Sequence, residues 1–283
     1  MASMLKSIIK PIITFSMEVY DYLVLYLGLL WLGILSLCWT LAATLLYPIL
    51  PKHYAIHLGR YAIMLSFCAY LVSLSASGRC SFDLTALDKL RNETPLIIAP
   101  KHPCLLDAVM IILRLLNVAC VMKSELMNSI FLGAGARLAR YISNEQIRQM
   151  TLEASDDFKT GSHLLLFPEG TRPTQQPINP LKGSIALISL KAQVPVQTIL
   201  IETNSPYLSK GWSLFRKPSM PVSYKITLGK RFDPPENSHD LMTELEDYFL
   251  HALKPTTQNS ILPLTTSQHQ GKFCLNSKEA TLP

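Results

Sequence analysis

The sequence predicts an α/β domain with a mostly parallel sheet flanked by helices, preceded by an N-terminal transmembrane or membrane-embedded helical segment. Two observations predict this architecture. Residues 22–50 carry no charged side chain over 29 positions, and about 20 apolar residues suffice for a helix to cross a bilayer. From about residue 80 onward, short apolar runs alternate with amphipathic stretches, a pattern typical of parallel strands joined by helices.

A second apolar stretch follows at residues 54–77, and Arg60 interrupts it near its start. Its uncharged part is at the short limit for a membrane span. The stretch either closes a helical hairpin with the first one or lies in the membrane interface with Arg60 snorkelling to the surface. We therefore assign residues 1–78 to a membrane anchor of one or two helices.

The α/β domain is assigned to residues 79–253. Apolar runs predict strands at 95–100, 117–123, 140–143, 163–167, 194–202 and 221–229. Helical periodicity between them predicts helices at 103–116, 126–139, 145–161, 184–193 and 237–253. Residues 254–283 are rich in Thr, Ser, Gln, Asn and Pro, a composition that favours a disordered tail.

The charge distribution and the cysteine spacing indicate which kinds of ligand the protein binds. The net charge is +6, and the Lys and Arg residues are spread along the chain without a dense run. This distribution argues against nucleic-acid binding and is compatible with attraction to anionic lipid headgroups. The six cysteines form no C-x-x-C pair and no zinc-binding spacing, so we expect no metal site.

The stretch "KHPCLLD", residues 101–107, lies where a predicted strand turns into a predicted helix. Because Pro103 favours the first helical turn, His102 is expected just outside the helix and Asp107 in its second turn. The histidine can then fold back onto the carboxylate, which would fix its tautomer and leave the other ring nitrogen as a base. The alternative is a histidine at the helix N-cap and a solvated aspartate.

The stretch "FPEGTR", residues 167–172, follows another apolar strand. Ligands bind at the carboxyl ends of strands in open α/β sheets. Here that end carries Glu169, Gly170, Thr171 and Arg172, and a guanidinium fits phosphate oxygens. Lys182 adds a second cation ten residues on. The alternative is a polar turn with a surface pair between Arg172 and Glu169.

Together, the two stretches resemble the glycerolipid acyltransferase family, whose type member is lysophosphatidic acid acyltransferase. The family's first motif, Asn-His followed by four residues and Asp, is similar to residues 101–107. Its third motif, Phe-Pro-Glu-Gly-Thr-Arg, matches residues 167–172 throughout, and its fourth resembles residues 194–199. The resemblance covers roughly residues 80–250.

The resemblance implies transfer of a fatty acyl group from an acyl-carrier-protein or coenzyme A thioester to a lipid hydroxyl, as in phospholipid synthesis, without a cofactor or metal. His102 would be the general base and Asp107 would orient it. Residues implied to hold the acceptor are Glu169, Gly170, Thr171 and Arg172, with Lys182 and Lys101 as further candidates. The enzyme would lie in a membrane, in a bacterium the inner one, with its catalytic domain facing the cytoplasm.

The chain departs from the family pattern at two positions. Lys101 replaces the usual asparagine, and Asn144 stands where the second motif commonly has an arginine that helps to bind glycerol phosphate. Two acceptors therefore stay open: lysophosphatidate, and a non-phosphatidate acceptor as in ornithine-lipid, polyene or glycolipid synthesis.

Two other classes of function remain alternatives. The same His–Asp pair could serve a lipid hydrolase, although the sequence has no G-x-S-x-G nucleophile elbow. The fold could also serve a non-catalytic lipid-binding protein, although all four residues His102, Asp107, Glu169 and Arg172 are present.

Overall fold

The structure is a computed structural model that describes residues 2–174 and 178–253. The predicted tail at 254–283 lies outside the described residues. The helices are α1 Ala2–Leu46, α2 Lys52–Ala76, α3 Asp107–Ile112, α4 Ser124–Met127, α5 Gly133–Leu138, α6 Ile147–Lys159, α7 Ser184–Ala192 and α8 Ser238–Ala252, with a 3-10 helix η1 at Thr85–Leu90.

The strands form one seven-stranded sheet in the order β1-β7-β6-β2-β5-β3-β4. Their bounds are β1 Cys80–Asp83, β2 Ile97–Pro100, β3 Val118–Met122, β4 Ile142–Ser143, β5 His163–Leu165, β6 Val196–Thr203 and β7 Val222–Phe232. Every neighbouring pair is parallel except β6 and β7, which are antiparallel. The predicted fold class, a mostly parallel sheet between helices, is confirmed.

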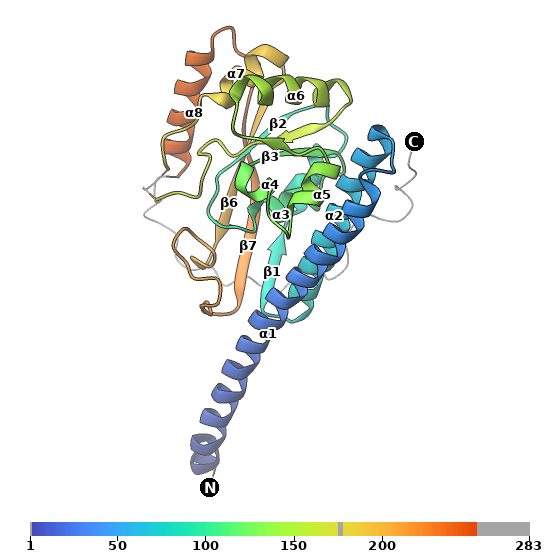
Figure 1. Cartoon of the computed structure of the whole chain (residues 1–283). Coiled ribbons are helices and arrows are strands. Elements are labelled where there is room, and N and C mark those ends of the chain that lie inside the picture. Colours follow the sequence, from blue (N-terminus) through green and yellow to red (C-terminus); the bar gives the residue numbers. More distant parts are fainter. Residues whose placement is uncertain (1, 175–177, 254–283) are drawn as a thin grey trace.

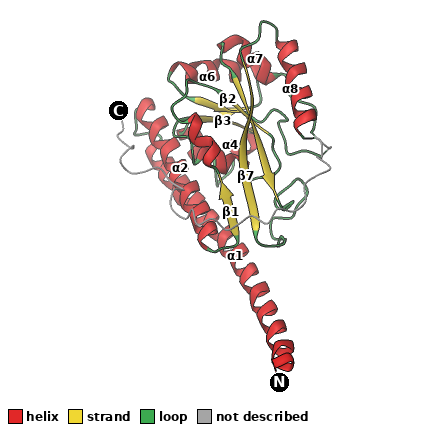
Figure 2. Ribbon diagram, turned by 180° about the vertical axis from the view of Figure 1, so that it is seen from behind, coloured by secondary structure: helices red, strands yellow, loops and turns green. Residues whose placement is uncertain are grey.

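Helices cover both faces of the sheet, which explains why β2, its middle strand, is apolar throughout (Figures 1 and 2). On β2, Ile97 and Ala99 belong to the core beneath α6, α7 and α8. Ile98, between them, belongs to the opposite core, which includes residues of α2 and α3. This alternation follows from the two-residue period of a strand.

Several element predictions are corrected. The predicted helix at 103–116 is shorter, because residues 103–106 form turns and α3 begins only at Asp107. The predicted helix at 126–139 is two short helices, α4 and α5, separated by residues 128–132. Strand β1 and helix η1 were not predicted from the sequence.

Helix α1 is 45 residues long, or roughly 67 Å at the α-helical rise. Its N-terminal half projects away from the domain, and its C-terminal half lies along the domain beside α2 (Figure 1). One side of that half, including Leu25, Leu29 and Trp39, packs on the core. Its other side exposes large apolar side chains, such as Leu27 and Leu41.

Helix α2 is anchored to the domain by Arg60, which is 3% exposed. Its Nη2 lies 3.1 Å from Asp157 Oδ2, its Nη1 donates to Asn117 Oδ1 and Ser162 Oγ, and its Nε donates to the carbonyl of Ala139. The alternative in which Arg60 snorkels to a membrane surface is therefore wrong. The charge that interrupts this apolar stretch points into the protein.

Gly59 permits this close packing of α2. A Cβ atom at position 59 would lie 2.7 Å from the backbone nitrogen of Ala139, closer than Cβ atoms approach other atoms. A glycine beside Arg60 therefore lets α2 approach the end of α5.

We predict that Arg60→Ala destabilises the protein by about 3–5 kcal/mol, because it leaves the Asp157 carboxylate buried without its main partner. Chemical unfolding in detergent would measure the loss. Arg140→Ala is the matched control, since Arg140 contacts the same carboxylate at 3.6 Å but is 37% exposed. The control should cost less than about 1 kcal/mol. Equal losses for the two variants would contradict a buried anchor.

Candidate active site

The two sequence motifs meet at one edge of the sheet. Strands β2 and β5 are parallel neighbours, so their carboxyl ends lie side by side. His102 follows β2 by two residues and Phe167 follows β5 by two residues. The rings of these two side chains are in contact, with centroids 4.1 Å apart. The edge therefore joins segments separated by about sixty residues of sequence.

His102 and Asp107 form the predicted pair. His102 Nδ1 lies 2.9 Å from Asp107 Oδ2. Asp107 is the first residue of α3, not a residue of a second turn, because the turns at 103–106 bring the chain round before the helix starts. The aspartate is completely buried, whereas the His102 side chain is 16% exposed. The carboxylate thus orients the ring, and the ring keeps access to solvent.

Cys104 supplies two further hydrogen bonds to the same carboxylate. Its backbone N–H donates to Asp107 Oδ2 at 2.9 Å, and its thiol donates to Oδ1 at 3.0 Å. Burial raises the pKa of the Cys104 thiol, so the thiol keeps its proton and acts as a donor rather than a nucleophile. No role for Cys104 was predicted from the sequence. Its position between His102 and Asp107 was the available signal.

These donors offset part of the cost of burying a charge. Burial raises the pKa of Asp107 above its ordinary value, and the hydrogen bonds from His102 and Cys104 lower that pKa in part. Two donors share Oδ2, and among the described residues the thiol is the donor found on Oδ1.

Glu169 is a second buried carboxylate at this edge, 3% exposed. The backbone N–H of Asn179 donates to its Oε2 at 2.8 Å, and its Oε1 has no hydrogen-bond partner among the described residues. Burial raises the pKa of Glu169, and nearby backbone N–H groups and Lys101 lower it in part. The pKa of Lys101 is itself lowered by partial burial, against the attraction of Glu169 and Asp107. A cation and two carboxylates therefore surround His102.

The remaining residues of the stretch 167–172 form a turn and hold a neighbouring loop. Gly170 has φ +67°, a left-handed conformation that favours glycine. Thr171 is partly exposed. Arg172 Nη1 donates to the carbonyls of Leu208 and Ser209 at 2.7 and 2.8 Å. One nitrogen of this guanidinium is therefore bound to the protein backbone.

Two other predicted residues lie farther out. Lys182 is exposed, and its side chain lies beside Gly170. Asn144 follows β4, the edge strand, which β3 and β5 separate from β2. At a strand spacing of about 4.8 Å, Asn144 lies roughly 14 Å from the strand of His102. Lys123, which follows β3 at the same edge, was not predicted; its place directly after an apolar strand was the signal for it.

Comparisons with known proteins agree with this arrangement. Residues 81–202 match the family model described as Acyltransferase. The structure is similar to the crystal structure of the 1-acyl-sn-glycerophosphate (LPA) acyltransferase PlsC from Thermotoga maritima, with a TM-score of 0.53 and 16% sequence identity. That match covers 78% of this chain and 94% of that chain. No curated protein sequence matches the chain.

We predict that Cys104→Ala destabilises the protein by about 1–3 kcal/mol at neutral pH, since it leaves Asp107 Oδ1 buried without a donor. Because burial raises the native-state pKa of Asp107, stability falls as pH rises above about 4, the value in unfolded chains. Loss of the thiol should raise that pKa further and extend the fall to higher pH.

Thermal unfolding of wild type, Cys104→Ala and Cys104→Ser across this pH range would measure the effect. Serine keeps a donor and should restore most of the stability. A loss in Cys104→Ala that is the same at every pH would show that the thiol only fills space.

Proposed function

We propose that this protein transfers a fatty acyl group from a thioester to the hydroxyl of a membrane lysolipid. The match of residues 81–202 to the Acyltransferase family model and the similarity in fold to an LPA acyltransferase support acyltransferase activity in lipid synthesis. The observation that carries the proposal is the buried carboxylate 2.9 Å from His102 Nδ1, since it gives the other ring nitrogen the properties of a base.

The reaction needs one base and one pair of proton transfers. His102 Nε2 accepts the proton of the acceptor hydroxyl while the hydroxyl oxygen attacks the thioester carbonyl. The tetrahedral intermediate then collapses, the C–S bond breaks, and the thiolate takes the proton from the imidazolium. Asp107 stays ionised and stabilises the imidazolium. No acyl-enzyme forms, and the protonated Cys104 thiol takes no part as a nucleophile.

Polar groups around His102 suit a polar acceptor head. Lys101 and Glu169 lie at the two strand ends that carry the site, and Glu169 Oε1 is available to accept a hydrogen bond from a hydroxyl. The turn at Gly170 and Thr171 and the exposed Lys182 extend this surface. Arg172 would reach an acceptor phosphate through the nitrogens not bound to the backbone.

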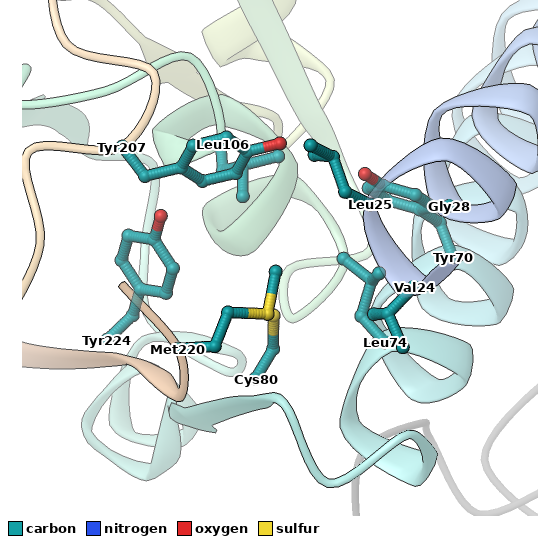
Figure 3. A pocket seen from close by; sticks show the side chains of 10 residues that line it. All are labelled: Val24, Leu25, Gly28, Tyr70, Leu74, Cys80, Leu106, Tyr207, Met220 and Tyr224. Atoms are coloured by element: carbon teal, nitrogen blue, oxygen red, sulfur yellow. The ribbon is translucent and has the colours of Figure 1, made fainter. Parts of the chain in front are cut away.

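A small apolar cavity lies next to the site. Its volume is about 20 Å³, and it lies between α1, α2 and Leu106, the residue before Asp107 (Figure 3). Its lining includes Leu25, Tyr70, Leu74 and Met220. An apolar lining of this kind can contact the hydrocarbon part of a lipid substrate.

The two N-terminal helices support membrane association. The spans Ile9–Leu46 and Lys52–Ala76 are long and apolar enough to cross a membrane. We propose that they hold the enzyme on the bilayer, with the catalytic domain on the cytoplasmic side, where acyl thioesters of coenzyme A and acyl carrier protein occur. An acceptor and a product that live in the bilayer require such an attachment.

The acceptor has a second candidate. Asn144, in place of the family's second-motif arginine, removes one cation from the acceptor side of the site. This favours acceptors other than lysophosphatidate, such as the lyso forms of ornithine lipids or glycolipids, through the same mechanism.

We predict that His102→Ala lowers acyl transfer by about 10²–10⁴-fold, because the acceptor hydroxyl loses its base. Membranes holding either protein would be given radiolabelled acyl thioester, on coenzyme A or acyl carrier protein, and a panel of lysolipids. His251→Ala is the matched control, since His251 is exposed on α8, and it should transfer at the wild-type rate.

The labelled product separates the alternatives. Label in phosphatidate identifies lysophosphatidate as acceptor, and label in another lipid alone identifies the second candidate. Histidine-dependent release of free fatty acid, without transfer, would replace the proposal with a hydrolase. An unchanged biological role in His102→Ala cells would replace it with a lipid-binding protein.

A further inference from the structure

The segment that connects β6 to β7 is rich in basic and aromatic side chains that have no role in the proposed reaction. Residues 205–221, here named the β6–β7 loop, contain Lys210, Arg216 and Lys217 and no acidic residue. They also contain Trp212, Leu214 and Phe215. A mixture of aromatic, apolar and basic side chains is typical of segments that lie in the headgroup region of a membrane.

One end of this loop is fixed to the candidate active site. The carbonyl of Leu208 accepts from the backbone N–H of Leu105 at 3.3 Å and from Arg172 Nη1 at 2.7 Å. Tyr207 and Leu208 are buried. Both sequence motifs therefore hold the loop, one through Leu105 and the other through Arg172.

The other end of the loop is fixed to α1. Lys217 Nζ lies 3.6 Å from Asp21 Oδ2 and 5.0 Å from the ring centroid of Tyr22. The Phe215 ring lies 6.4 Å from that of Tyr26. These contacts make the loop continuous with the apolar helix that we propose to enter the membrane.

The part between the two ends faces solvent. Phe215 is 63% exposed and Leu214 is 44% exposed. Lys210 and Arg216 are exposed too, and the Arg216 guanidinium stacks on Trp212 at 4.6 Å. The loop lies at the end of the domain from which the N-terminal half of α1 projects (Figure 1). The exposed apolar residues of the loop therefore lie at the same end of the domain as the projecting half of α1.

We propose that the β6–β7 loop is a second membrane contact that binds an anionic bilayer surface, with Phe215 and Leu214 inserted and Lys210 and Arg216 on lipid phosphates. The proposal rests on the membrane association in the proposed function. Through Leu105 and Arg172, the same loop holds the edge of the active site against the surface that carries the acceptor. Arg172 is then a positioning residue for the loop.

Fluorescence quenching of Trp212 tests this contact directly. The chain has three tryptophans, and the substitutions Trp31→Phe and Trp39→Phe leave Trp212 alone in the full-length protein. The protein would be bound to vesicles of phosphatidylcholine with brominated acyl chains, with or without about 30% phosphatidylglycerol. We expect strong quenching in the anionic vesicles and weak quenching in the neutral ones.

Charge reversal provides the matched comparison. The double variant Lys210→Glu with Arg216→Glu should need at least about ten times more anionic lipid for half-maximal quenching. Each of these cations is attracted to the anionic surface, and the variant reverses both charges. Lys159→Glu with Lys191→Glu, which reverses two exposed cations on α6 and α7, should leave the quenching unchanged. Absence of quenching, or quenching that ignores lipid charge and loop charge alike, would overturn the proposal.

Two further measurements keep the test independent of folding and of activity. Wild-type protein, with all its tryptophans, would be cross-linked to phosphatidylglycerol carrying a photoreactive headgroup, and adducts are expected within residues 205–221; adducts confined to other segments would overturn the proposal. His102→Ala protein should show the same quenching as its parent, so a failure of acyl transfer is distinguished from a failure of the loop to bind.

Discussion

The Asp107 carboxylate has no exposed surface, and the rest of the site is arranged around this constraint. A buried charge is tolerated only when donors surround it. The turns at 103–106 bring the backbone and thiol of Cys104 to it, and they place His102 where its ring becomes the third donor. The same carboxylate that is costly to bury therefore sets the tautomer of His102, the proposed base.

The two apolar N-terminal helices and the candidate active-site edge are parts of one packing arrangement. Residues of α1 and α2 share a core with α3, and Arg60 on α2 is bound to Asp157 on α6. The apolar pocket lies between those helices and the start of α3. The proposed anchor thus forms one wall of this cavity beside the candidate site. A soluble enzyme acting on the same acceptor would have to extract it from the bilayer.

Local sequence patterns predicted the strands that carry the site, because buried parallel strands are continuous apolar runs bounded by turn residues. They also placed His102 beside Asp107, since five residues and a proline restrict the path between them. They missed the partners of Arg172, which are carbonyls 36 and 37 residues later in the chain. They also missed β1, whose four residues carry no long apolar run. Contacts between residues so far apart in the sequence depend on the tertiary fold, and the spacing of residues within a local motif does not reveal them.

A double-mutant cycle on the acyl-transfer rate would test the central claim, that His102 and Asp107 act as one unit. The variants are His102→Ala, Asp107→Asn and both together, all assayed with the acceptor found for the wild type. If the carboxylate works through the imidazole, the double variant will be about as slow as His102→Ala alone. If the two losses multiply instead, Asp107 acts separately from His102, and the catalytic pair is not the unit that the geometry indicates.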